Sequence, residues 1–336
     1  MQQRHTADSQ HETGADQRES IGPLFIVLNA ASGSSDADAA GRAIRDVLSA
    51  ASRQHELFVV TDASMLQATA ERVAALAQQR AGAVVAAGGD GTINAVAQAV
   101  LPTERPFGVI PQGTFNFFGR THGVPETTEA ATRSLVDAVI RPTQIGLVND
   151  HVFNVNASMG LYPELLERRE EDKQRLGRSR LVALWSGVKT LLGEHRQYTI
   201  ELEHHDRNTS SAGTLRTTTL FVGNNALQLE KIGLMQADAP QRGELAALVL
   251  KPVGPLGMIG VALRGALGKL GDSRNVHSFS FTRMTVRPWL PYGRHRIKIA
   301  TDGEIMRMRP PLVFRVSPTP LMLLVPRERN EHDNAR

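Results

Sequence analysis

A glycine-rich turn between an apolar run and an amphipathic helix is the feature that most constrains this chain. Residues 83–87 form an apolar run of strand length. The segment Gly88-Gly89-Asp90-Gly91-Thr92 follows, and apolar side chains then recur with the spacing of a helix that buries one face, at Ile93, Val96, Ala97, Val100 and Leu101. The pattern predicts a strand, a tight turn and a helix in succession.

The three glycines of this turn favour a phosphate site. Without Cβ atoms, Gly88, Gly89 and Gly91 allow positive φ and the close approach of a ligand. The following helix directs unpaired N–H groups and its positive dipole end toward the turn. A tight connection without a ligand would explain the glycines equally well, since short motifs often arise by chance. The spacing matches neither the dinucleotide-binding G-x-G-x-x-G nor the P-loop G-x-x-x-x-G-K-[ST].

Strands and helices alternate on both sides of the turn. Apolar runs predict strands at 24–28, 57–60 and 107–110, and helical spacing predicts helices at 40–51, 66–77 and 128–139. Such alternation is typical of a doubly wound parallel sheet with helices on both faces. Ligands of these sheets bind beyond the carboxyl ends of the strands, so the loop after residue 110 should lie beside the glycine turn.

The pattern changes near Arg141-Pro142, where we place a domain boundary. Residues 144–158 have the character of two strands around Asn149-Asp150, and one helix is expected at 259–270. Further strands are expected at 198–204, 215–222, 245–250, 278–287, 296–300, 312–316 and 321–325. An apolar stripe at 181–192 has helical spacing and is more typical of a core than of a lipid contact. The second domain is therefore predicted to be an antiparallel, sandwich-like β domain.

Length and composition limit the classes of protein. A chain of 336 residues with 41% hydrophobic residues favours two domains, which we place at 23–142 and 143–311. Residues 1–22 and 327–336 are expected to be tails, the first of them disordered because it has almost no apolar side chains. No cysteine is present, which excludes disulfides, thiolate metal sites and cysteine nucleophiles. Without an 18-residue apolar run or a signal-peptide core, the chain is expected to be cytoplasmic.

The turn Gly88-Gly89-Asp90-Gly91-Thr92 resembles the nucleotide-binding signature of the diacylglycerol kinase catalytic superfamily, which includes bacterial lipid kinases and sphingosine kinases, and that of NAD kinases. Residues 111–120, Pro-Gln-Gly-Thr-Phe-Asn-Phe-Phe-Gly-Arg, are similar to the superfamily's second motif, P-x-G-T-x-N-[DF]-x-[AG]-R. Asn29 and Ser32-Gly33 resemble its N-P-x-S-G, with Ala30 in place of the proline. The resemblance covers about residues 23–326 and implies that strands at about 312–326 return to the first domain, which binds the nucleotide.

The resemblance implies ATP and Mg²⁺ as cofactors and a set of residues that bind ATP: Asn29, Thr61, Gly88, Gly89, Asp90, Gly91, Thr92, Asn94, Gly113, Thr114 and Asn116. Thr301-Asp302-Gly303-Glu304 taken alone is typical of a hairpin turn. In the superfamily, a D-G-E motif places a carboxylate against the acceptor hydroxyl. Asp302 is then the first candidate for the general base, and Glu304 would assist the nucleotide or metal. Asp90 would organise Mg²⁺ or phosphate, or compete for the role of base, with the nucleotide-bound Mg²⁺ near Asp90 and Asp302.

Two departures from the superfamily pattern stand out. Residues 237–245 are similar to a segment, P-x-A-x-x-[ND]-D-G-x-[LF], that holds a structural Mg²⁺ in many bacterial members, but Arg242 replaces its carboxylate. A cation there would repel the metal, so the substitution puts the structural ion in question. The other departure, Phe117 where many members have Asp, has no chemical interpretation from sequence.

A basic stretch suits a lipid kinase. The formal net charge is +4, and cations outnumber acids between residues 283 and 309, at Arg283, Arg287, Arg294, Arg296, Lys298, Arg307 and Arg309. A solvated basic face is the ordinary explanation, but each cation near an anionic leaflet contributes about 1 kcal/mol of attraction. Trp289 and Tyr292 would suit the headgroup level. We expect a peripheral contact with anionic membrane and no nucleic-acid partner.

The leading hypothesis is an ATP-dependent kinase that phosphorylates a hydroxyl of diacylglycerol, a sphingoid base or a related lipid. One alternative is an NAD kinase-like enzyme, which shares the glycine turn but lacks the G-T-x-N loop and the terminal D-G-E motif. The other is a catalytically silent lipid-binding or regulatory protein on the same fold. The sequence does not identify the lipid, because interchangeable apolar residues build acyl-chain pockets, and it leaves the oligomeric state open.

Overall fold

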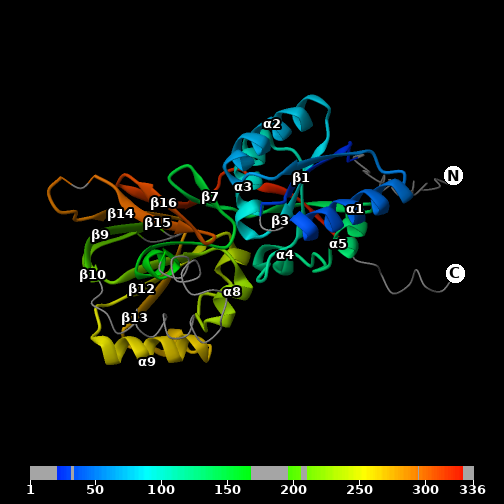
Figure 1. The fold of residues 1–336 in the computed structure, drawn as a ribbon. Coiled ribbons are helices and arrows are strands. Elements are labelled where there is room, and N and C mark those ends of the chain that lie inside the picture. The colour runs from blue at the N-terminus through cyan, green and yellow to red at the C-terminus, as the bar shows by residue number, and fades with distance from the viewer. Residues whose placement is uncertain (1–20, 32–33, 168–195, 206–209, 294, 328–336) are drawn as a thin grey trace, which may run out of the picture.

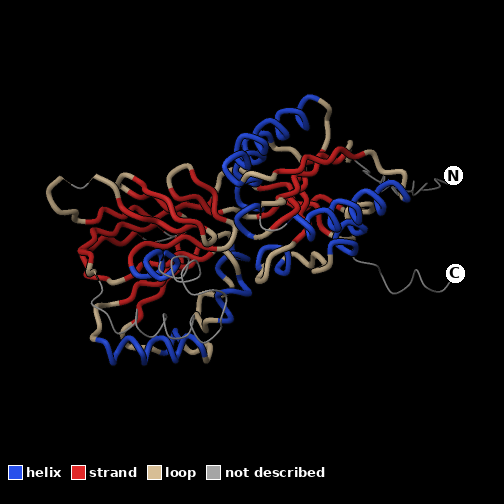
Figure 2. Tube along the Cα trace, in the orientation of Figure 1, coloured by secondary structure: helices blue, strands red, loops and turns tan. Residues whose placement is uncertain are grey.

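The computed structural model describes residues 21–31, 34–167, 196–205, 210–293 and 295–327. The chain folds into two lobes that lie side by side (Figure 1). Helices flank one sheet in the first lobe, and strands make up most of the second (Figure 2). The predicted fold class is confirmed. Both chain termini and the helix expected at 181–192 lie outside the described residues.

The first lobe is built on a sheet with the strand order β2-β1-β3-β4-β18-β5. Its strands run parallel except for β5, which is antiparallel to β18. They are β1 Leu24–Asn29, β2 His55–Val60, β3 Ala83–Gly88, β4 Phe107–Pro111, β5 Val139–Thr143 and β18 Leu321–Val325. All six residues of β3 are buried, because helices cover both faces of the sheet.

The helices of this lobe are α1 Ser34–Ala50, α2 Leu66–Gln79, α3 Asp90–Val100, α4 Phe117–Thr121 and α5 Thr128–Ser134. Helices α2 and α3 pack together on one face, and α1 and α5 pack on the other (Figure 1). The prediction of a helix at 128–139 was wrong in its second half. Helix α5 ends at Ser134, and Val139 begins strand β5 because it pairs with Val325 of β18.

The second lobe contains two antiparallel six-stranded sheets. One has the order β10-β9-β14-β17-β6-β7 and the other β13-β12-β11-β8-β15-β16. Their facing sides share one apolar core, which includes Ile200, Phe281, Ile299 and Phe314. The strands of the first are β6 Gly146–Val148, β7 His151–Phe153, β9 Tyr198–His205, β10 Ser210–Thr217, β14 Arg283–Pro288 and β17 Leu312–Val316. Those of the second are β8 Asn156–Gly160, β11 Thr219–Gly223, β12 Leu245–Leu250, β13 Val276–Phe281, β15 Ile297–Thr301 and β16 Glu304–Met308.

Two helices cover the outer side of the second of these sheets. Helix α8 spans Ala226–Lys231, and helix α9 spans Pro255–Ala266. Helix α9 begins four residues before the start of the helix expected at 259–270. Their buried residues Leu229 and Met258 join a third apolar cluster with Leu248 of β12. Residues 161–167 are also helical. Short 3₁₀ turns occur at Ala63–Met65, Leu101–Thr103, Ala239–Arg242 and Leu270–Asp272.

The C-terminal strands connect the two lobes. Strand β18 returns to the first sheet beside β4, whereas β17 pairs with β14 and β6 in the second lobe. Helix α3 also reaches the second lobe, where Gln98 Oε1 accepts a hydrogen bond of 2.7 Å from the amide of Val152 in β7. The helix that begins at the glycine turn is thereby fixed to both lobes.

Candidate functional site

The glycine turn lies at a topological switch point of the first sheet. Strands β1 and β3 are neighbours at the centre of the sheet, with β2 beside β1 and β4 beside β3. The strand order thus reverses between β1 and β3, and open α/β sheets bind ligands at such a point. Asn29, at the end of β1, donates a hydrogen bond of 2.8 Å from Nδ2 to Oγ1 of Thr92. The turn and the end of β1 therefore form one surface, beside which Thr61 follows β2 as an exposed residue.

The second motif packs against the turn. The amide of Gln112 donates to the carbonyl of Gly88 at 2.9 Å, and the amide of Gly113 donates to Oδ1 of Asn116 at 3.0 Å. A Cβ atom placed on Gly113 would lie 3.1 Å from Cα of Gly89, so a side chain there would separate the two segments. Thr114 is exposed at the tip of this loop. The structure thus brings the two motifs together.

Asp90 begins α3 and carries a half-buried carboxylate. Burial raises its pKa, while hydrogen bonds from the backbone amides of Asn116 and Phe118 act in the opposite direction. Its buried Oδ1 has no hydrogen-bond partner among the described residues. A carboxylate oxygen that lacks a donor at the N-terminus of a helix suits a cation, because hard divalent ions prefer oxygen ligands.

Asp302 occupies the turn between β15 and β16 with φ of 48°, a left-handed conformation that is rare outside glycine. Each oxygen of its buried carboxylate accepts two hydrogen bonds. Oδ1 accepts from the amides of Val155 and Asn156, both at 2.9 Å. Oδ2 accepts from the amide of Asn154 and from Nδ2 of Asn94, both at 2.7 Å. Burial raises the pKa of Asp302 to about 6, and these donors limit the rise.

Glu304 places its carboxylate against the glycine turn from the other lobe. A Cβ atom added to Gly91 would lie 2.5 Å from Oε1 of Glu304, so a side chain there would displace this carboxylate from the turn. Burial raises the pKa of Glu304, and the charge of Asp302 adds to the rise. Glu304 forms no hydrogen bond or ion pair with any residue that the structure describes. Its lone pairs are therefore open to a ligand.

Asn94 takes a different position from the rest of the predicted ATP-binding set. It is buried on α3, and Nδ2 donates both to Asp302 and to the carbonyl of Val152, at 2.9 Å for the second bond. Its amide therefore joins the two lobes. Sequence reasoning missed this arrangement, together with the three consecutive amides at 154–156 that bind Asp302. The only local signal was the pair of asparagines, Asn154 and Asn156, around one apolar residue.

Comparison with known proteins supports the resemblance that the motifs suggested. Residues 23–148 match the family model described as the diacylglycerol kinase catalytic domain. Over these residues the chain is similar to that family. A diacylglycerol kinase of Bacillus subtilis is 45% identical over 85 residues, which cover 24% of this chain and 28% of the relative. A protein of Cronobacter sakazakii named as a probable lipid kinase YegS-like is 40% identical over 95 residues, 27% of this chain and 32% of the relative.

A solved structure extends the likeness of fold to the second lobe. A diacylglycerol kinase from Bacillus anthracis superposes with a TM-score of 0.65 at 17% identity, over 94% of this chain and 99% of that one. At this identity the match shows the fold alone. The aligned regions span about half or less of the length of the curated relatives.

Several buried polar atoms surround the Asp302 turn of this diacylglycerol kinase-like fold. On β8 and the residues before it, Oδ1 and Nδ2 of Asn154, Oδ1 of Asn156 and Oγ of Ser158 lack hydrogen-bond partners among the described residues, as does Oγ1 of Thr301. Buried polar groups are normally satisfied by protein, water or ligand. Because these atoms have almost no accessible surface, buried water molecules are the partners that suit them.

The segment that resembles the family's structural Mg²⁺ site is organised by Arg242. Its guanidinium contacts the carboxylate of Asp238 and lies 3.3 Å from that of Glu244. A positive charge thus lies between the carboxylates of Asp238 and Glu244, at the position where the family segment P-x-A-x-x-[ND]-D-G-x-[LF] resembled by residues 237–245 has a carboxylate. Across the described part of the chain, no group of three or more acidic or histidine residues is arranged to hold a metal ion.

The raised pKa of Asp302 predicts a pH dependence of stability in the absence of nucleotide and Mg²⁺. The folded state holds this proton up to about pH 6, whereas the unfolded chain loses it near the ordinary value of 3.8. The contribution of Asp302 to the free energy of unfolding is therefore complete below about pH 4 and is lost by about pH 6, a change of about 3 kcal/mol. Urea unfolding at several pH values should show this slope in the wild type. A slope of equal size in Asp302→Asn would contradict the assignment.

Proposed function

We propose that this protein is an ATP-dependent lipid kinase that phosphorylates a hydroxyl of diacylglycerol, a sphingoid base or a related lipid. One observation carries the proposal: the glycine turn of the kinase family meets, across the cleft between the lobes, the carboxylate of Glu304 and the turn that holds Asp302. A nucleotide phosphate on the turn would lie beside carboxylates that can accept a proton. Phosphoryl transfer needs little more than such positioning and charge neutralisation.

The residues of the turn suit a nucleotide with its metal ion. The amides at the start of α3 and in the 111–120 loop would bind the phosphates. Asp90, whose Oδ1 lacks a donor, would hold the Mg²⁺ that accompanies ATP. When bound, this ion supplies positive charge between the phosphate oxygens. Because Arg242 supplies the charge between Asp238 and Glu244, we propose no structural Mg²⁺ at that second position.

Two carboxylates compete to take the proton of the acceptor hydroxyl. Asp302 has a pKa raised to about 6, which suits a base near neutral pH, but all four of its hydrogen-bonding positions are taken. Glu304 also has a raised pKa, and it has no hydrogen-bond partner among the described residues. Asp302 then either releases one donor to act as the base or positions the turn so that Glu304 can act.

The acceptor is proposed to be a lipid with a hydroxylated head. The turn that holds Asp302 and the carboxylate of Glu304 would place its hydroxyl beside the nucleotide phosphate. The G-T-x-N loop and the D-G-E turn favour this acceptor over NAD, as the family resemblance does. Incubation with Mg-ATP should transfer the γ-phosphate to one component of a lipid panel, and transfer to NAD in place of lipid would overturn the proposal.

We also propose that the protein meets its substrate at an anionic membrane surface. No helix in the described ranges is long and apolar enough to cross a bilayer. Trp289 and Tyr292 are exposed beside the basic stretch, of which Arg294 lies outside the described residues. Charge attraction weakens with salt, since the Debye length falls from about 10 Å at 0.1 M to about 3 Å at 1 M.

The membrane proposal predicts a specific pattern of vesicle binding. In sedimentation, the protein should bind vesicles that contain anionic lipid, bind neutral vesicles weakly, and leave the anionic vesicles at high salt. Equal binding to both kinds of vesicle at every salt concentration would contradict an electrostatic contact.

A further inference from the structure

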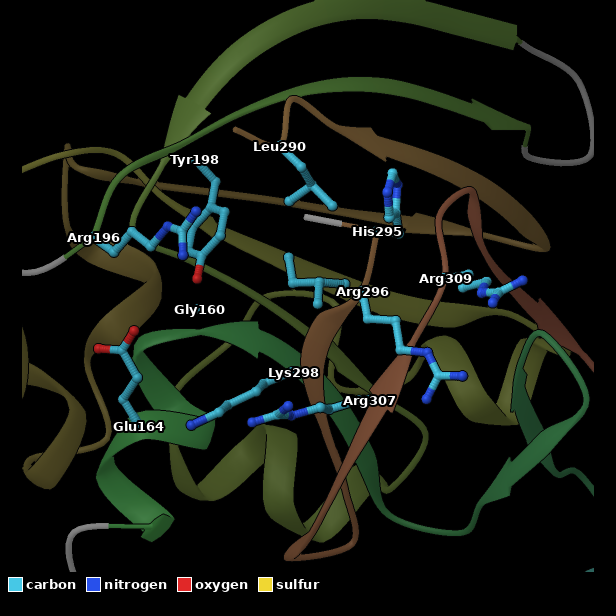
Figure 3. A pocket seen from close by; sticks show the side chains of 11 residues that line it. Gly160, Glu164, Arg196, Tyr198, Leu290, His295, Arg296, Lys298, Arg307 and Arg309 are labelled. Carbon is cyan, nitrogen blue, oxygen red and sulfur yellow. The ribbon is translucent and has the colours of Figure 1, made fainter. Parts of the chain in front are cut away.

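A cavity in the second lobe is lined mainly by cations. Its volume is about 760 Å³, and its lining includes Arg196, Arg296, Lys298, Arg307 and Arg309, with Glu164 as the acidic side chain (Figure 3). The remaining walls come from Gly160, Tyr198, Leu290, His295 and Ile297. Four of the five cations belong to the basic stretch noted in the sequence, and the fold gathers them around one hollow.

The register of the β15–β16 hairpin forces two of these cations together. Lys298 stands directly opposite Arg307 in the antiparallel pair, an arrangement of like charges that is destabilising by itself. Figure 3 shows both side chains extending side by side toward Glu164, while Arg309 points away from them. Nζ of Lys298 lies 2.5 Å from Oε2 of Glu167. Arg307 has no ion pair or hydrogen bond with any described residue, so no residue in the described ranges compensates its charge.

The opposite wall adds groups that suit an oxyanion. Arg196 lies over the ring of Tyr198, with Cζ 5.1 Å from the ring centroid, and Tyr198 is buried. An arginine held on an aromatic ring presents its guanidinium in a fixed orientation. Together with Lys298 and Arg307 it surrounds the cavity with donors. Such donors recognise carboxylate and phosphate groups, and several cations around one hollow favour the more highly charged phosphate.

This cavity is separate from the glycine turn. Lys298 lies on β15, four residues before Asp302 in the turn that follows, a separation on the order of 13 Å for an extended chain. That span is too long for one phosphate to reach both places. From the convergence of these cations and the absence of a described partner for Arg307, we propose that the cavity is a second phosphate-binding site. This inference does not depend on the proposed kinase activity.

The phosphate belongs either to an anionic phospholipid headgroup or to a small soluble molecule. Leu290 lines the cavity, and its neighbours Trp289 and Tyr292 are exposed, with 61% of the surface of Trp289 accessible. Exposed aromatic residues beside a cationic hollow are typical of a surface that meets lipid headgroups. Both sources share the same chemistry at Arg196, Lys298 and Arg307.

The test compares Arg307→Gln with Arg42→Gln. Both residues are exposed and each substitution removes one positive charge, but Arg42 lies on α1 in the first lobe, outside the cavity and outside the basic stretch. Binding is measured by calorimetry for inorganic phosphate, and by sedimentation for phosphatidylcholine vesicles with and without phosphatidylglycerol. Arg307→Gln should weaken binding about five-fold, the effect of losing one cation near an anionic surface, and adding Lys298→Gln should weaken it further. Arg42→Gln should bind nearly as the wild type does, and unchanged melting temperatures show that all variants fold.

The results assign the source of the phosphate or overturn the site. Loss confined to anionic vesicles identifies a lipid headgroup, and loss confined to inorganic phosphate identifies a soluble phosphate; either supports the proposal. Binding that is the same in Arg307→Gln and in the wild type for both probes would overturn it. Equal weakening by Arg42→Gln and Arg307→Gln would also overturn it, because only diffuse surface charge would then be acting.

Discussion

Gly89→Val is expected to abolish ATP binding and leave the fold intact. Gly89 has φ of −80° and ψ of 179°, a conformation open to valine, so the backbone is not strained. The new Cβ atom would lie 3.7 Å from Cα of Gly113, and the methyl groups beyond it would enter the gap between the turn and the 111–120 loop. A phosphate would then lose its approach to the amides. Calorimetry with Mg-ATP should show no binding.

Gly213→Val is the matched control for that substitution. Gly213 lies on β10, and a Cβ atom there would meet nothing within 4 Å. This variant should bind Mg-ATP as the wild type does, and thermal unfolding should show that both variants fold. Normal ATP binding by Gly89→Val would place the nucleotide elsewhere.

Asp302→Asn is expected to remove nearly all turnover. Each oxygen of the Asp302 carboxylate accepts hydrogen bonds from two donors, so the NH₂ group of asparagine would face two donors and accept from neither. Each buried donor left without an acceptor costs about 1 to 3 kcal/mol of stability. The turn that positions both carboxylates of the cleft is disturbed, and a general base contributes about 10²- to 10⁴-fold in rate. The affinity for ATP should change little, because no hydrogen bond within the glycine turn is lost.

The pH dependence of the remaining activity distinguishes the two roles of Asp302. If Asp302 is the base, the acid limb of the rate profile near pH 6 disappears in the variant. If Asp302 positions Glu304, the slow variant keeps an acid limb and Glu304→Gln loses it. Asp46→Asn, an exposed change on α1, should leave turnover unchanged. Near-normal turnover of Asp302→Asn would move the role of base to Glu304 or Asp90.

The sequence predicted the first lobe well because its signals are local. The glycine turn, the apolar strand before it and the periodic helix after it are contiguous, so propensity and spacing determine them. The boundary near residue 142 was harder, since β5 exists only because β18 pairs with it from more than 170 residues away. Partners so distant leave no local periodicity.

The candidate site was predicted in its residue types but not in its connections. Motifs indicated Asp302 and Asn94 separately, whereas their hydrogen bond joins residues 208 positions apart. The three amides that bind Asp302 belong to the backbone, so the asparagine pair around Val155 is a weak signal for them. Of the cationic cavity, the sequence indicated only the basic stretch. Arg196 and Tyr198 are distant from that stretch in the sequence, and the register of β15 and β16 determines which of its side chains lie together.

Transfer of radiolabel from γ-labelled Mg-ATP to a lipid extract tests the central claim most directly. The labelled product is separated by thin-layer chromatography, and NAD is supplied in a parallel reaction. We predict that the wild type and Gly213→Val label one hydroxyl-bearing lipid and that Gly89→Val labels none. Label that appears in NAD alone, or a Gly89→Val variant that labels lipid as fast as the wild type, would contradict the assignment of this cleft as a lipid kinase site.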